Sequence, residues 1–190
     1  DREIVVVSQN DEFTYRYNDY ELVTIILSML GEHQKQNAAL AITALIELNE
    51  QGLIELDFNK MIDGIESVRW TGRIEQVHDK PLIILAGAHN SESIDALIDT
   101  IKQYHDKEKV DILFSAINGK PINEMVKHLS LIAHTFYATE FDFPKALRKE
   151  EIVGSIENDE IQLVDDYVEF IKNYRGDTLV ITGSLYFISE

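Results

Sequence analysis

The spacing of apolar and polar residues along the chain predicts an ordered series of strands and helices. Residues 4–7 and 12–17 read as two short strands, the second of which alternates aromatic with polar side chains. The Ala/Leu-rich stretch at 33–52 has apolar residues at helical spacing and ends in Gly52, which predicts a long helix with a glycine at its C-terminus. A second helix is predicted over 58–68.

After residue 78, short continuous apolar runs alternate with amphipathic segments. The runs predict strands at 82–86, 110–117, 133–139, 161–164 and 178–182. The amphipathic segments predict helices near 91–105, 121–131, 145–157 and 166–174. Apolar strands between helices are typical of parallel pairing with both sheet faces covered, so we predict a doubly wound α/β domain with a mostly parallel sheet. The polar stretch 75–81, which ends in proline, is predicted to be a hinge before that domain.

Composition and charge exclude several classes of protein. The 190 residues include 34 Asp and Glu against 17 Lys and Arg, a formal net charge of -17, so nucleic acids and anionic membranes would repel the chain. No apolar run approaches the roughly 20 residues of a membrane span. Cysteine is absent, which excludes disulfides and thiolate metal sites and agrees with a cytoplasmic location. The chain begins without Met in a strand-like stretch, so we expect it to be part of a longer protein.

The turn after the strand at 82–86 is the first candidate site. Ligands of open parallel sheets bind at the carboxyl ends of the strands, beside helix N-termini with free N–H groups. Gly87 would allow close approach of the backbone, Asn90 or Ser91 could cap the following helix, and His89 would point into the cleft. The alternative is a tight turn with a surface histidine.

Further candidates lie outside this turn. The guanidinium of Arg73, in the sequence WTGR, suits phosphate oxygens, and a surface ion pair with Glu75 is the alternative. Gln34 and Asn37 share one helical face, and their amides match the edge of adenine, although helix capping would also explain them. Ser184 follows the last strand and could bind a ligand carboxylate or amine; a β-bulge or a bend in the strand is the alternative.

Other kinds of site are disfavoured by residue spacing. NGKP at 118–121 is not a phosphate loop, because Phe114 and Pro121 stand where Gly and Ser or Thr are needed, and it predicts a turn with proline opening a helix. The six histidines lack the spacing of a zinc site, so no metal-ligand set is expected in this chain. Neither a Gly-x-Ser-x-Gly motif nor a cysteine nucleophile is present, which disfavours a hydrolase.

Four motifs in a fixed order resemble those of folylpolyglutamate synthase, often bifunctional with dihydrofolate synthase, in the Mur ligase superfamily. They are LGEHQKQNAALAI, WTGRIE, LIILAGAHN and LVITGSLYFI. The resemblance implies that residues 1–76 are the C-terminal part of a central ATP-binding domain and that 77–190 form a Rossmann-like ligase domain. It implies a cytoplasmic, monomeric enzyme that uses ATP to join glutamate to a folate carboxylate through an acyl phosphate. The phosphate loop and the Mg²⁺ ligands would lie upstream, so we expect this chain alone to be inactive.

The same resemblance assigns roles to the candidate residues. Arg73 and His89 would be catalytic, with Arg73 neutralising charge on the transferred phosphate. Glutamate would be bound by His89 and Ser184. ATP would be contacted by Gln34, Asn37, Arg73, Gly87 and Asn90.

The chain departs from the family pattern at three places. Ala86 stands where the family usually has an aspartate near the ATP ribose. The family's Asp-Lys-Asp appears as Gly119-Lys120-Pro121, and its Pro-Arg-Ala as Pro144-Lys145-Ala146. Two alternatives therefore stay open: another Mur-type ligase that adds an amino acid to a different carboxylate, and a non-catalytic binding module with the same fold.

Overall fold

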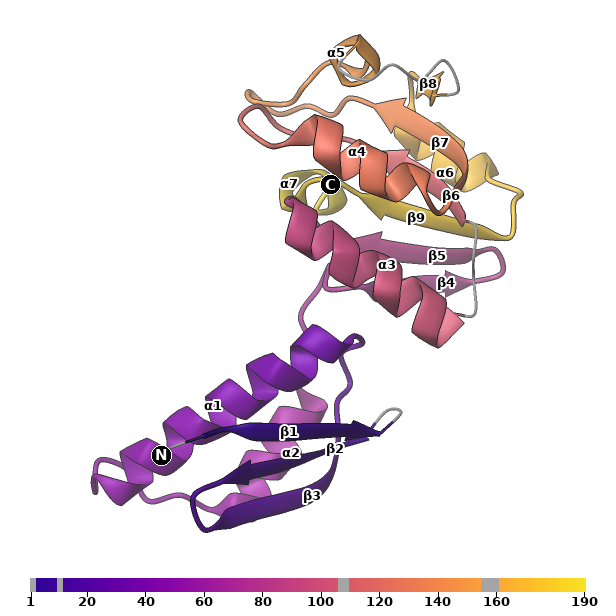
Figure 1. Cartoon of the computed structure of the whole chain (residues 1–190). Helices are drawn as coiled ribbons and strands as arrows, with labels where there is room; N and C mark the ends of the chain where they lie inside the picture. The colour runs from indigo at the N-terminus through magenta and orange to yellow at the C-terminus, as the bar shows by residue number, and fades with distance from the viewer. Residues whose placement is uncertain (1–2, 10–11, 106–109, 155–160) are drawn as a thin grey trace. The chain divides into compact units, whose positions relative to one another are not determined.

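The chain folds into two compact units, Asp1–Trp70 and Thr71–Glu190, in a computed structural model that describes residues 3–9, 12–105, 110–154 and 161–190 (Figure 1). The division falls at Trp70, before the boundary at 76 that the sequence suggested, so that Arg73 belongs to the second unit. The assignment of the units to a central ATP-binding domain and a C-terminal ligase domain stays a prediction.

The first unit packs a small antiparallel sheet against two helices. The sheet has the order β1 (Val5–Gln9), β2 (Glu12–Tyr17), β3 (Tyr20–Ile26), and the helices are α1 (Glu32–Glu50) and α2 (Phe58–Ser67). Aromatic residues of β2 and apolar residues of α1 form its core. β3 was not predicted, because a β-bulge in its pairing with β2 and a positive φ of 60° at Thr24 interrupt the alternation of buried and exposed residues.

The second unit is built on a six-stranded sheet. Its order is β4 (Glu75–Asp79), β5 (Leu82–Ala86), β9 (Thr178–Thr182), β6 (Val110–Phe114), β7 (Ala133–Thr139), β8 (Ile161–Val164). The pairing of β4 with β5 is antiparallel and all other pairings are parallel. The predicted α/β fold with a mostly parallel sheet is confirmed.

Helices cover both faces of this sheet. One face packs against α3 (Ser91–His105), α4 (Ile122–Ser130) and the short α5 (Lys149–Gly154). The other face packs against α6 (Tyr167–Asn173) and α7 (Leu185–Ile188). Because alternate residues of the inner strands β5, β6 and β9 enter one core or the other, these three strands are mostly apolar.

Three local predictions were wrong. The stretch 75–81 is not a hinge: it contains the edge strand β4, and its polar residues fit there because nearly all of β4 is exposed. The helix predicted at 145–157 begins only at Lys149, because Ala146 forms a β-bridge with Ile117; residues 155–157 lie outside the described part. The alternative of a β-bulge or a bend in the strand at Ser184 is wrong, because Ser184 is the N-cap of helix α7.

Candidate active site at the carboxyl edge of the sheet

The strand order brings together loops that are far apart in sequence. Strand β9 lies between β5 and β6, with Thr182 paired to both Ala86 and Phe114 at the strand ends. The loops that follow these strands carry His89, Ser184 and Lys120, so they meet at one edge, where α3, α4 and α7 begin (Figure 1). Antiparallel β4 starts at the same edge, which places the segment carrying Arg73 there as well.

A backbone hydrogen bond joins the WTGR segment to the histidine turn. The N–H of Gly87 donates to the carbonyl of Gly72 at 2.7 Å. The carboxylate of Glu75 accepts a hydrogen bond from the N–H of Gly72 at 2.9 Å, and within the described ranges no ion pair of Glu75 with Arg73 is formed. The exposed guanidinium of Arg73 therefore remains available to an anionic ligand.

His89 is half-buried and its ring is held in one orientation. Its Nδ1 lies 2.9 Å from the carbonyl oxygen of Gly87. Because a carbonyl oxygen only accepts hydrogen bonds, Nδ1 carries the proton, and Nε2 of the neutral ring has a lone pair to offer. The contact holds the ring within the turn, and the role of His89 toward a ligand stays a prediction.

The side chain of Asn90 caps α3. Its Oδ1 accepts from the N–H of Ser93 at 2.9 Å, while the Ser93 hydroxyl oxygen accepts from the N–H groups of His89 and Asn90 at 3.0 and 3.1 Å. The predicted cap is therefore confirmed, and the nucleotide contact of Asn90 stays a prediction. Sequence reasoning overlooked Ser93, although a polar residue three positions after an N-cap is the signal of reciprocal capping.

Gly87 is required by packing inside the chain. A Cβ built on it would lie 2.1 Å from Cδ2 of Leu185 in α7. The close neighbour of Gly87 is therefore a leucine of the same unit. A contact of Gly87 with a nucleotide stays a prediction.

Ser184 is 2% exposed and caps α7. Its Oγ accepts from the N–H of Tyr186 at 3.2 Å, which leaves the hydroxyl proton for another acceptor. The neighbouring hydroxyls of Thr182 and Ser115 are buried without a hydrogen-bond partner in the described part of the chain. Thr182 pairs with Ala86 across the two strands, and the alanine side chain offers no hydrogen-bond acceptor.

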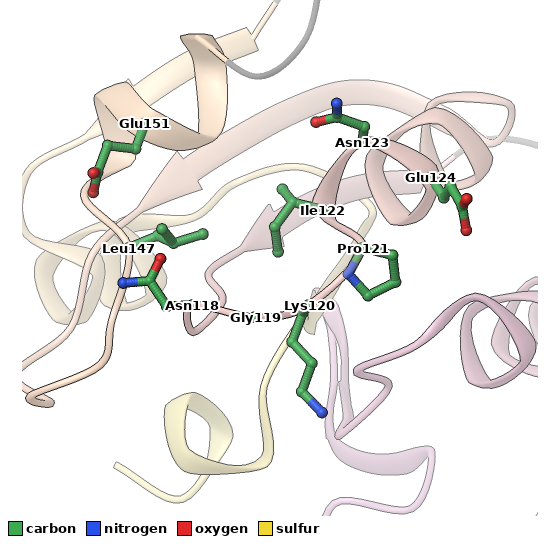
Figure 2. A pocket seen from close by; sticks show the side chains of 9 residues that line it. All are labelled: Asn118, Gly119, Lys120, Pro121, Ile122, Asn123, Glu124, Leu147 and Glu151. Carbon is green, nitrogen blue, oxygen red and sulfur yellow. The ribbon is translucent and has the colours of Figure 1, made fainter.

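A cavity of about 450 Å³ opens beside the loop that follows β6 (Figure 2). It is lined by Asn118, Gly119, Lys120, Pro121, Ile122, Asn123, Glu124, Leu147 and Glu151. As predicted, Pro121 opens a helix. In Figure 2, the amine of Lys120 extends away from Glu124 and Glu151. Sequence reasoning did not include half-buried Lys120 among the site residues, although a lysine in a glycine turn after a buried strand is a signal.

The amide cluster of α1 lies in the first unit. The two amides are hydrogen-bonded to each other: Nδ2 of Asn37 donates to Oε1 of Gln34 at 3.3 Å, and Nε2 of Gln34 lies 3.0 Å from Nε2 of His33. The N-cap of α1 is Gly31, without a side-chain cap, so capping does not explain either amide. Gln34 is buried and Asn37 is exposed.

The described residues include no cluster of three or more His, Asp or Glu side chains that could hold a metal ion. None of the helices in the described ranges has the length and apolar character needed to cross a membrane.

Comparison with known proteins places the chain in a family. Residues 72–185 match the family model described as Mur ligase, glutamate ligase domain. A dihydrofolate synthase/folylpolyglutamate synthase from Bacillus subtilis (strain 168) is 34% identical over 185 residues, which are 95% of this chain and 43% of the relative. The chain thus spans about two fifths of the length of this relative.

Solved structures share the fold. The E. coli FolC structure in complex with ADP, without folate substrate, matches with a TM-score of 0.83 at 19% identity, over 98% of this chain and 44% of that one. A bifunctional folylpolyglutamate synthase/dihydrofolate synthase with Mn, AMPPNP and L-glutamate bound matches with a TM-score of 0.76 at 19% identity, over 96% and 43%. With the family match covering most of the second unit, this chain belongs to the Mur ligase family, in its folylpolyglutamate synthase and dihydrofolate synthase branch.

Proposed function

We propose that this chain is the C-terminal part of an ATP-dependent ligase that adds glutamate to the γ-carboxylate of a folate. Joining glutamate to dihydropteroate would use the same chemistry, and the B. subtilis relative carries both activities in its name. The observation that carries the proposal is the meeting of the Arg73, His89, Lys120 and Ser184 segments at one edge of the sheet.

Negative charge is the main difficulty of this reaction. A carboxylate takes the terminal phosphoryl group of ATP, and the amine of glutamate then attacks the acyl carbon and releases phosphate. Arg73 suits this charge, because its exposed guanidinium has no carboxylate partner among the described residues and can donate two parallel hydrogen bonds to phosphate oxygens. In a chain with a net charge of -17, such a local cation is needed to attract an anionic substrate.

His89 supplies a group that can exchange a proton. With Nδ1 donating to the Gly87 carbonyl, Nε2 of the neutral ring can accept a proton from the glutamate amine as it attacks. The protonated ring would instead donate from Nε2 to a phosphate oxygen. Both roles use the same ring orientation.

Lys120 and Ser184 suit the carboxylates of glutamate. The amine of Lys120 extends away from the carboxylates that line the neighbouring cavity (Figure 2). The hydroxyl of Ser184 can donate its proton while it accepts from the Tyr186 N–H. Asn37 and Gln34 of the first unit remain the proposed adenine contacts, and the Mg²⁺ ligands are proposed to lie outside this chain.

A non-catalytic binding module with this fold is the second candidate. The observation in its favour is Ala86, which supplies no carboxylate where the resemblance to the family implies an aspartate.

The test uses the full-length polypeptide that contains this chain, with Mg-ATP, tetrahydrofolate and glutamate, and detects ADP and glutamylated folate by mass spectrometry. We expect product, and we expect Arg73→Gln to lower kcat by about 10²–10³-fold, as for other groups that stabilise charge in a transition state. Arg69→Gln, which removes the same charge from an exposed arginine of the first unit, is the matched control and should act like the unsubstituted protein.

Two further samples separate the alternatives. The 190-residue chain alone should form no product. An Ala86→Asp version that gains activity would show that the missing carboxylate limits the reaction. Product with a cell-wall precursor and none with folate would establish another Mur-type ligase. If the folded protein forms no product with any carboxylate acceptor, the result would favour the non-catalytic binding module.

A further inference from the structure

The turn between β5 and α3 is organised around the hydroxyl of Ser93. Its Oγ accepts hydrogen bonds from the N–H groups of His89 and Asn90, at 3.0 and 3.1 Å, and lies 2.9 Å from the carbonyl oxygen of Asn90, to which it donates. The N–H of Ser93 in turn donates to Oδ1 of Asn90. The hydroxyl therefore uses both its acceptor and its donor capacity inside the turn.

These contacts occupy the amides that would otherwise bind an anion. N–H groups at the start of a helix are the usual partners of phosphate and carboxylate oxygens at the edge of a parallel sheet. Here the N–H groups of His89, Asn90 and Ser93 have partners within the turn, and that of Gly87 donates to Gly72. The Ser93 oxygen stands where a ligand oxygen would accept from two adjacent amides.

The same contacts fix the backbone on both sides of the His89 ring. Gly87 is tied to Gly72, the N–H of His89 is tied to Ser93, and the ring itself donates to the Gly87 carbonyl. A rotation of the imidazole would break this last bond, and a shift of the backbone would break the others. The direction in which Nε2 points thus depends on Ser93.

We propose that Ser93 is a positioning residue for His89, and that its hydroxyl closes the amides of residues 89 and 90 to ligand oxygens. A ligand oxygen then finds both amides already bound to the Ser93 hydroxyl. The role of Nε2 toward a substrate rests on the proposed function, whereas the closure of the two amides is a property of this chain alone.

The test on this chain is NMR of ¹⁵N-labelled protein with inorganic phosphate as the probe. In the unsubstituted chain, the His89 ring should be the Nδ1–H tautomer, and phosphate should leave the amide signals of His89 and Asn90 in place. In Ser93→Ala, those two amides should exchange with solvent about tenfold faster, as expected for the loss of one hydrogen bond, and should shift when phosphate is added.

Two variants serve as controls. Ser93→Thr keeps the hydroxyl and should restore the slow exchange and the single tautomer. Ser91→Ala removes a hydroxyl of the same helical turn that binds Glu124 instead, and should leave the His89 signals unchanged. The proposal would be overturned if added phosphate shifted the amide signals of His89 and Asn90 in the unsubstituted chain. This titration does not depend on whether a variant folds. Unchanged exchange and tautomer in Ser93→Ala would also overturn it.

The ligase assay adds a second readout. In the full-length polypeptide, Ser93→Ala should lower kcat about tenfold with little change in the KM for Mg-ATP, and Ser93→Thr should restore kcat. A change confined to KM would contradict a positioning role. If the unsubstituted polypeptide forms no product, the proposed function fails, and the NMR result still decides whether Ser93 closes the two amides.

Discussion

Individual glycines show how tightly the candidate site is packed. Gly87 has ordinary backbone angles, yet a Cβ on it would overlap the side chain of Leu185. Gly183 has a positive φ of 112°, and a Cβ there would meet the carbonyl oxygen of Ser115 at 2.2 Å. Gly87 of the AGAHN motif and Gly183 of the TGS motif are therefore favoured by contacts within the chain, before any ligand is considered.

At this scale we predict that Gly87→Ala destabilises the chain by about 1–3 kcal/mol, because Leu185 or the turn must move to admit the methyl group. Chemical denaturation followed by circular dichroism measures the change. Gly64→Ala is the matched control: no atom lies within 4 Å of its Cβ position in the middle of α2, so it should stabilise by about 0.5–1 kcal/mol. Equal effects of the two substitutions would contradict the packing at Gly87.

Tyr174, the residue that follows α6, joins α6 to β6 and β9. It lies at the edge of the sheet opposite to the candidate site. Its hydroxyl donates to Oδ2 of Asp111 in β6 at 2.7 Å and lies 2.9 Å from the carbonyl oxygen of Thr178 in β9. Burial, followed by the hydrogen bond and the negative charge of Asp111, raises the pKa of the Tyr174 hydroxyl above its usual value. The contact thus holds α6 to two neighbouring strands.

This raised pKa predicts a loss of stability in alkali. Above about pH 10 the unfolded chain releases the tyrosine proton while the folded chain retains it, so the free energy of unfolding falls as pH rises. Tyr174→Phe should be less stable at neutral pH, because Asp111 loses a hydrogen-bond donor. Above pH 10 its free energy of unfolding should fall less steeply with pH, because about one proton fewer is released on unfolding. Urea denaturation across this range measures both. An unchanged slope would show that another tyrosine is responsible.

For the whole molecule, the division at Trp70 assigns the WTGR segment to the ligase-like unit. Ile74 is buried in the core on the α3 side of the sheet, and Gly72 bonds the histidine turn. Both contacts belong to residues that precede position 76, where the sequence placed the boundary. The second unit is therefore incomplete without them.

We predict that a fragment of residues 71–190 unfolds in one cooperative transition, and that a fragment of residues 77–190 is less stable. The shorter fragment lacks Ile74, the start of β4 and the Gly72–Gly87 hydrogen bond, and burying one isoleucine alone contributes about 1.5–3 kcal/mol. Thermal unfolding of both fragments measures the difference. Equal melting temperatures would favour the boundary at 76.

Most strands and two of the long helices of the second unit could be predicted from the sequence. Apolar runs located the five parallel strands, and helical spacing located α3 and α4, because the apolar side chains of these elements face a core and local periodicity records it. Three elements have no such periodicity: β4 is exposed, β3 contains a bulge, and α7 has only four residues. The sequence pattern therefore did not predict β3 or α7, and it predicted a hinge in place of β4.

The sequence by itself determined the α/β class and the family motifs, because both depend on residue types at short spacing. Only the tertiary structure decided that β9 lies between β5 and β6, since strand order depends on contacts between distant segments. That order brings the Arg73, His89, Lys120 and Ser184 segments to one edge. The fold also decided that Glu75 binds the Gly72 amide and that Ser93 holds the histidine turn, because hydrogen bonds depend on distances that a linear pattern does not contain.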